Sequence, residues 1–239
     1  MDTAGEHPLS DLYGLPGSGT GSLHGDYESP APRARWASRL LIVAVVADGL
    51  SLLALASQRS LLDRGPGAIS LAEWHRSQSR IGGLALVELA LLILGAIFVL
   101  RWLHLAYRNL TAIGAAELRF TPGWAVGWWF VPIANIVRPK QVLDDLWRAS
   151  AADGTGSGWR RLPRPNVTAI WWLTIVLAGV TGRLAVAMST DTIDHLKTRD
   201  GALMFSHATS IVAAICLWQV VRKVTARQDA RAAALERAG

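Results

Sequence analysis

The sequence predicts an all-α integral membrane protein with four transmembrane helices. Of its 239 residues 51% are hydrophobic and the mean hydropathy is +0.28, yet the formal net charge is +6 and the isoelectric point is near 10.2. An apolar chain with surplus basic charge is typical of membrane proteins whose loops carry Lys and Arg. Four long apolar stretches also have the length of bilayer spans. The single cysteine, Cys216, excludes an internal disulfide and a zinc site built from paired cysteines.

Residues 1–32 form a Gly-, Pro- and Ser-rich segment with five acidic residues and no Lys or Arg. Such a composition cannot bury enough apolar surface to fold, so we expect a disordered acidic tail. The segment lacks the charged start, apolar core and cleavage site of a signal peptide, and we expect it to stay attached. The helical membrane domain is expected over 33–225, followed by a C-terminal tail over 226–239. Because the acidic tail contributes −5, the rest of the chain carries +11.

Four apolar stretches of about 20 residues predict the membrane spans. They cover approximately 40–58, 81–103, 166–190 and 202–221. The stretch 120–137 is also uncharged, but it contains helix-breaking prolines and several tryptophans, which favour the headgroup region. We therefore expect 120–150 to be a re-entrant or interfacial segment. It should end in an amphipathic helix over 139–150 that lies on the cytoplasmic surface, with Pro139 at its first position.

The charge of the loops favours four spans with both termini in the cytoplasm. In that arrangement the inside loops hold 17 basic residues and the outside loops hold 6. An arrangement with five spans, in which 120–137 crosses the membrane, gives 15 inside and 8 outside. The positive-inside bias is larger with four spans.

Four ionisable side chains lie in the cores of the spans: Asp48, Glu88, Arg183 and His207. A rise of 1.5 Å per residue places Glu88, Arg183 and His207 about 10 Å below the outer edge of the membrane, with Asp48 nearer its middle. Charges in a span are costly and mark functional sites, so this polar cluster is a candidate proton relay or small-ligand site. The alternative is a structural ion pair between Glu88 and Arg183, with His207 as a neighbour.

A second set of candidate residues surrounds the tryptophan-rich segment. We expect these residues to form a Trp/Pro platform on the cytoplasmic face that binds lipid headgroups or a partner protein. The alternative is an anchoring belt at the membrane boundary combined with a helix break. The platform residues are Arg108, Asn109, Trp124, Trp128, Pro132, Asn135, Arg138, Pro139 and Trp147.

This stretch also resembles a known family. The motifs are Arg108-Asn109, the run from Pro122 to Pro132, Asn135, Arg138-Pro139, the run from Leu146 to Ser150, Trp171-Trp172 and Gly182-Arg183. In this order they are similar to the bacterial membrane proteins grouped as domain of unknown function 4328, over about 37–225. One departure is Lys140, where the family pattern leads us to expect an aromatic residue. The resemblance implies a small multi-span protein of the bacterial plasma membrane, and it supplies no activity or ligand.

These features favour a non-enzymatic interaction or scaffold module. Its expected partners are the bilayer, with anionic headgroups at the basic loops, and an unidentified protein. The first alternative is a small transporter or channel subunit that uses the polar cluster. The second is a lipid-acting enzyme with Arg108, Asn109, Asn135 and Arg138 around a headgroup. The sequence has no recognisable nucleophile or acid/base pair, and we expect no cofactor, no metal and no nucleic-acid partner.

Overall fold

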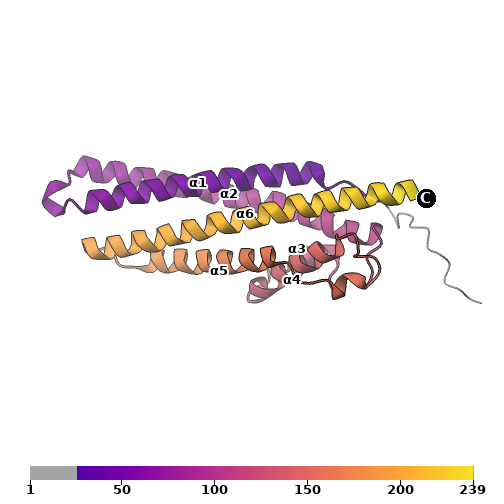
Figure 1. Ribbon diagram of the computed structural model, residues 1–239. Helices are drawn as coiled ribbons and strands as arrows, with labels where there is room; N and C mark the ends of the chain where they lie inside the picture. The colour runs from indigo at the N-terminus through magenta and orange to yellow at the C-terminus, as the bar shows by residue number, and fades with distance from the viewer. Residues whose placement is uncertain (1–25, 239) are drawn as a thin grey trace, which may run out of the picture.

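The fold is a bundle of four long helices with a smaller helical cap at one end (Figure 1). The computed structural model describes residues 26–238, so the expected tail lies mostly outside the described residues. The long helices are α1 (Ala31–Leu62), α2 (Leu71–Ala112), α5 (Asn166–Ala187) and α6 (Ile193–Ala238). The cap contains α3 (Pro122–Gly127) and α4 (Ala134–Ala149), and 3-10 turns lie at Pro66–Ala68 and Gly158–Arg161.

All four long helices are long and apolar enough to cross a membrane, which confirms the predicted fold class. Their outward faces are apolar as well. In α2, for example, Leu86 and Leu92 are 70% and 67% exposed, as expected for a surface that faces hydrocarbon and not water. The segment 120–137 contains only the short helix α3, a turn and the start of α4, so among the described residues there is no fifth spanning helix.

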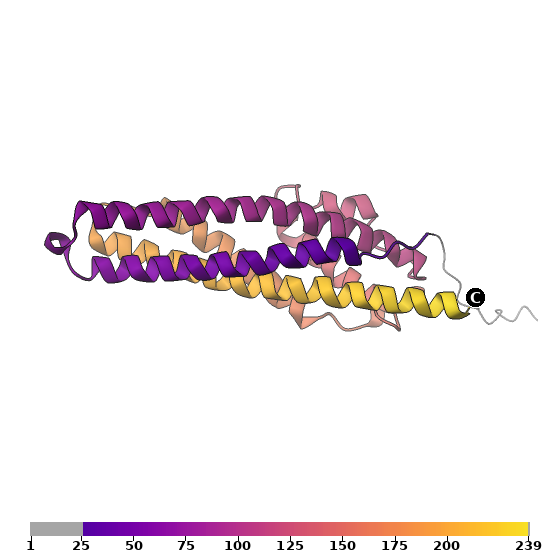
Figure 2. The same cartoon turned by 90° about the horizontal axis from the view of Figure 1, so that it is seen from above.

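The two helix hairpins turn at the same end of the bundle. The α1–α2 and α5–α6 connections lie at the left in Figures 1 and 2, at what we call the hairpin end. The start of α1, the end of α6 and the cap lie at the opposite end, called the termini end. Helix α2 begins at the hairpin end with a capping box, in which Ser70 and Glu73 each accept a backbone N–H.

Small residues bring α5 and α6 close together. A Cβ built on Gly182 would lie only 3.0 Å from Ser206 Oγ. The backbone of α5 at Gly182 therefore lies close to the Ser206 side chain of α6. Ser206 in turn donates to the carbonyl of Ala178 at 2.9 Å. Close approach through small residues and side-chain hydrogen bonds is how helices associate in lipid.

The termini end is packed like the core of a water-soluble protein. The extensions of α2 and α6 beyond the apolar stretches pack around α4, with Trp102, Tyr107, Leu143 and Trp159 fully buried. Helix α6 continues without a break to Ala238. The residues assigned by sequence to a C-terminal tail are therefore helical in the described part of the chain.

Helix α4 differs from the amphipathic surface helix that the sequence predicts. It begins at Ala134, and Pro139 lies inside it and not at its first position. Its polar side is buried as well: Asp145 is 0% exposed and Arg148 is 7% exposed. The sequence pattern predicts that this side faces solvent, because the pattern of one helix does not show its contacts with distant segments. In the structure Arg119 pairs with Asp145, and Thr168 donates a hydrogen bond to Asp144.

Candidate functional site

Three ionisable side chains from three different helices meet inside the bundle. His207 Nδ1 on α6 lies 2.7 Å from Asp48 Oδ1 on α1 and 3.6 Å from Glu88 Oε1 on α2. Ser51, one turn after Asp48, donates to Glu88 at 2.6 Å. We call Asp48, Glu88 and His207 the intramembrane triad.

The triad borders a cavity of about 530 Å³. Most of the wall is apolar and comes from α1, α2 and α6, while Ser206 and Ser210 add hydroxyl groups. Toward the termini end the wall includes Trp129 and Trp171, whose rings lie 5.9 Å apart. The turn between α3 and α4 thus reaches the cavity through Trp129. The first turn of α4, which follows it, accepts a hydrogen bond from Trp172 Nε1 at Ile136 O at 2.5 Å.

Arg183 does not join the triad. It lies on α5, its side chain is exposed, and its guanidinium donates to Gly179 O one turn earlier at 3.1 Å. Among the described residues no carboxylate lies within 4 Å of it, so the Glu88–Arg183 ion pair expected as the alternative is absent from the structure. The third member of the group is Asp48 and not Arg183, although the sequence predicts a different depth for Asp48.

The helix ends explain why Asp48 reaches the triad. Asp48 lies 14 positions before the end of α1 at Leu62. His207 lies 14 positions after the start of α6 at Ile193. Both are therefore about 21 Å from the hairpin end. Counting from the edges of apolar stretches misplaced Asp48, because the helices extend beyond those stretches. The sequence could have predicted that Ser51 lies beside the triad, since Asp48 and Ser51 are one helical turn apart and share a helix face.

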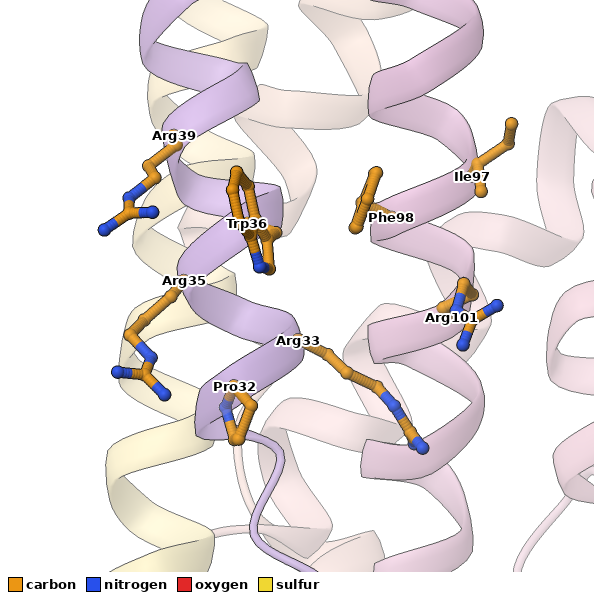
Figure 3. A pocket seen from close by; sticks show the side chains of 8 residues that line it. All are labelled: Pro32, Arg33, Arg35, Trp36, Arg39, Ile97, Phe98 and Arg101. Atoms are coloured by element: carbon orange, nitrogen blue, oxygen red, sulfur yellow. The ribbon is translucent and has the colours of Figure 1, made fainter.

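A second cavity lies at the termini end, between the first turns of α1 and the last part of α2. Its volume is about 590 Å³. Figure 3 shows Trp36 and Phe98 between the two helices, with Arg33 reaching from α1 toward α2. The lining residues, which we call the arginine groove, are Pro32, Arg33, Arg35, Trp36, Arg39, Ile97, Phe98 and Arg101.

The arginine groove is strongly cationic. Arg39 lies over the Trp36 ring at 5.0 Å, and the Trp36 and Phe98 rings are 6.1 Å apart. Arg33 is paired with Glu28 at 3.1 Å, whereas Arg35, Arg39 and Arg101 have no carboxylate within 4 Å among residues 26–238. In the sequence these arginines are recognisable only as loop charge. Arg101 cannot be placed beside the start of α1 from the sequence, because the two segments are far apart along the chain.

The residues expected to form the Trp/Pro platform separate into several groups. The Trp124 and Trp128 rings are tilted against each other with centroids 4.8 Å apart, and Arg138 lies 5.1 Å from the Trp128 ring. Pro132, in the turn before α4, and Asn135, in the first turn of that helix, are exposed, whereas Pro139 is buried.

The other three platform residues lie elsewhere. Arg108 and Asn109 both hold Glu28, through its carboxylate at 2.9 Å and its backbone carbonyl at 2.7 Å. Trp147 packs against α6, with Arg227 4.4 Å from its ring. Among the described residues, no hydrogen bond or ion pair joins Arg108 or Asn109 to Asn135 or Arg138.

A buried ionic network fixes α4 in the cap. Asp145 pairs with Arg148 at 2.7 Å and with Arg119 at 3.3 Å. Asp144 pairs with Lys140 at 2.7 Å and accepts a hydrogen bond from Thr168 at the start of α5. Burial raises the pKa of Asp145 above its ordinary value, although Arg119 and Arg148 act in the opposite direction.

The fold and these sites define the class of protein: a four-span helical membrane protein with a packed cap at its termini end. Within that class, the chain belongs to the family described as domain of unknown function (DUF4328), whose sequence model matches residues 66–226. No curated protein and no solved structure matches the chain.

Proposed function

We propose that the protein is a non-enzymatic membrane module that binds anionic lipid headgroups at its termini end and assembles a protein partner there. The arginine groove carries this proposal, because four guanidinium groups and two aromatic rings line it at the start of α1 and along Ile97–Arg101 of α2. Its volume falls in the range of small-ligand sites, about 300–1,000 Å³.

The chemistry of the groove fits a phosphate group. Guanidinium groups donate in a fork that matches phosphate oxygens, and tryptophan favours the depth of headgroups. Guanidinium groups also remain protonated at all physiological pH values, so they bind anions without serving as acid/base catalysts. These properties favour binding over catalysis.

The position of the groove supports a cytoplasmic orientation in a bacterial plasma membrane. The loops assigned to this side hold 17 basic residues against 6 on the other side. Basic segments next to a span attract the anionic cytoplasmic leaflet, with about 1 kcal/mol for each Lys or Arg near the surface.

The exposed apolar turn between α3 and α4 supports a second contact with the membrane or a partner. Phe130 is 71% exposed and Ile133 is 84% exposed, and Phe130 directly follows Trp129, whose ring contacts Trp171 of α5. Exposed apolar groups in one patch mark interaction surfaces. In our proposal this turn enters the interfacial layer and leaves the packed cap accessible to the partner.

Lipid retention tests headgroup binding. The full-length chain is purified in detergent, mixed with equal amounts of phosphatidylglycerol and phosphatidylcholine, and examined by native mass spectrometry. Replacing Arg35 and Arg39 with Gln removes about 2 kcal/mol of attraction, so phosphatidylglycerol retention should fall roughly 30-fold. The control replaces Arg76 and Arg80, which are exposed at the hairpin end, with Gln. Equal retention by both variants would refute the proposal.

A second candidate function, ion-linked transport, is favoured by the intramembrane triad and its cavity. Ionisable groups that face a cavity within a bundle are typical of ion and proton pathways. In proteoliposomes, a Glu88→Gln variant should then dissipate a pH gradient more slowly than the parent chain. Equal rates in variant, parent and empty vesicles would exclude this function.

A further inference from the structure

We propose that Asp48, Glu88 and His207 form a binding site for one divalent transition-metal ion of the Zn²⁺ or Mn²⁺ type. The inference names a ligand class for the second candidate function and does not depend on headgroup binding. It concerns binding, so it can hold whether or not the protein transports ions.

The geometry of the triad is close to that of a metal site. The three ligand atoms lie within 4.8 Å of one another. Two ligands at about 2.05 Å from a tetrahedral Zn²⁺ ion are about 3.3 Å apart. The separations of 2.7 Å and 3.6 Å from His207 Nδ1 bracket this value. The third separation is at most 4.8 Å, so a shift of about 1 Å or less in each ligand atom would complete the site.

Charge balance indicates a divalent ion. With a metal bound, the two carboxylate ligands and the neutral imidazole ligand carry −2, and net charge within a bilayer is costly. Among the described residues, Asp48, Glu88 and His207 are the only ionisable side chains that line the cavity, and Arg183 on α5 points to its own helix. One divalent cation neutralises this charge.

The ligand types select the class of metal. Imidazole suits Zn²⁺ and related transition metals, whereas carboxylates alone suit Mg²⁺ and Ca²⁺. A set of one imidazole and two carboxylates therefore favours a transition metal over Mg²⁺. Ser51 donates to Glu88 at 2.6 Å and orients that carboxylate, in the manner of the outer groups around metal ligands.

The adjoining cavity makes this an open site. The side chains of Glu88 and His207 are 24% and 18% exposed, and the cavity beside them holds about 530 Å³. Three protein ligands leave at least one coordination position for water or a second ligand, as in sites that exchange or react. A purely structural cluster needs no such space.

Calorimetry on the full-length chain in detergent tests the inference. After removal of metals with a chelator, the protein is titrated with Zn²⁺ and Mn²⁺, with Mg²⁺ as a comparison. We expect one Zn²⁺ per chain, bound at least tenfold more tightly than Mg²⁺.

Variants and a matched control assign the site. Glu88→Gln and His207→Gln should each weaken Zn²⁺ binding at least tenfold. The control pair is Asp191 and His195, which are 2.6 Å apart and exposed at the hairpin end. Changing both to Asn and Gln should leave the binding constant unchanged.

A spectroscopic measurement on the unmodified chain tests the site even if the substituted chains fail to fold. Co²⁺ bound to the triad should show the visible ligand-field bands of mixed nitrogen and oxygen coordination, and Zn²⁺ should displace it. Absence of stoichiometric binding and of these bands would overturn the inference, and so would equal binding by folded triad variants. Zn²⁺ binding without ion flux in proteoliposomes would retain the site and exclude transport. Proton flux without Zn²⁺ binding would retain transport and exclude the metal site.

Discussion

Replacing Arg148 with Met should destabilise the cap in a pH-dependent way. The change removes the 2.7 Å ion pair with Asp145, whose side chain is 0% exposed. Removing one partner of a buried pair costs about 3–5 kcal/mol, because the remaining charge is left in a poorly hydrated place. Arg119 stays at 3.3 Å from Asp145, so we expect a loss near the lower limit, about 3 kcal/mol at pH 8.

The sign of the pH effect follows from the pKa of Asp145. Burial already raises this pKa in the folded protein, and loss of Arg148 raises it further. A carboxyl group with a raised folded-state pKa favours the folded state when protonated, and this contribution is lost as the pH rises through that pKa. The Arg148→Met variant should therefore lose less stability at pH 5 than at pH 8.

Equilibrium unfolding in detergent at the two pH values provides the measurement. Adding Asp145→Asn to the variant removes the stranded charge and should recover more than half of the loss. The control is Arg160→Met, which breaks a pair with Glu117 of the same 2.7 Å length whose side chains are 49% and 61% exposed. That change should cost less than about 1 kcal/mol. An equal loss at both pH values, with no recovery by the second change, would refute the reasoning.

Two further predictions concern topology and helix packing. In a cysteine-free background, Cys placed at Ala68 and Cys placed at Ser157 should be labelled from opposite sides of the membrane, because these residues lie in loops at opposite ends of the bundle; labelling of both from one side would contradict four spans. Gly182→Leu should lower stability by about 1–3 kcal/mol, since its side chain would collide with Ser206. Gly83→Leu, with open space around the built Cβ, should be tolerated in the same thermal-unfolding assay, and equal losses would reject the packing argument.

The membrane helices could be predicted from the sequence because their signal is local. A bilayer requires about 20 consecutive apolar residues, and this pattern is legible without knowing what packs against it. The same holds for the break at 120–137, where proline and glycine prevent a long helix. Helix ends were less well predicted: α4 begins at Ala134, more than a turn before Pro139, because its first turn is positioned by contacts with α5.

The candidate sites depended on contacts between segments far apart in the chain. Asp48 and His207 meet although 159 positions separate them, and Arg183, equally polar in sequence, remains apart from them on α5. Hydropathy identifies which charges lie in the spans, but rotation and axial position of each helix decide which of them touch. Those two quantities arise from side-chain packing between helices.

The sequence alone therefore determined the class of fold, the number of spans and the basic character of the loops, since each depends on local composition. The tertiary structure decided that Asp48, Glu88 and His207 form one group and that the Trp/Pro platform residues make contacts in different places. It also decided that the arginine groove forms between the start of α1 and Ile97–Arg101 of α2. The physical reason is that the free energy of transfer into lipid depends on the hydropathy of each residue, which the local sequence gives. Proximity between helices is set by the small residues, hydrogen bonds and packed rings at their interfaces.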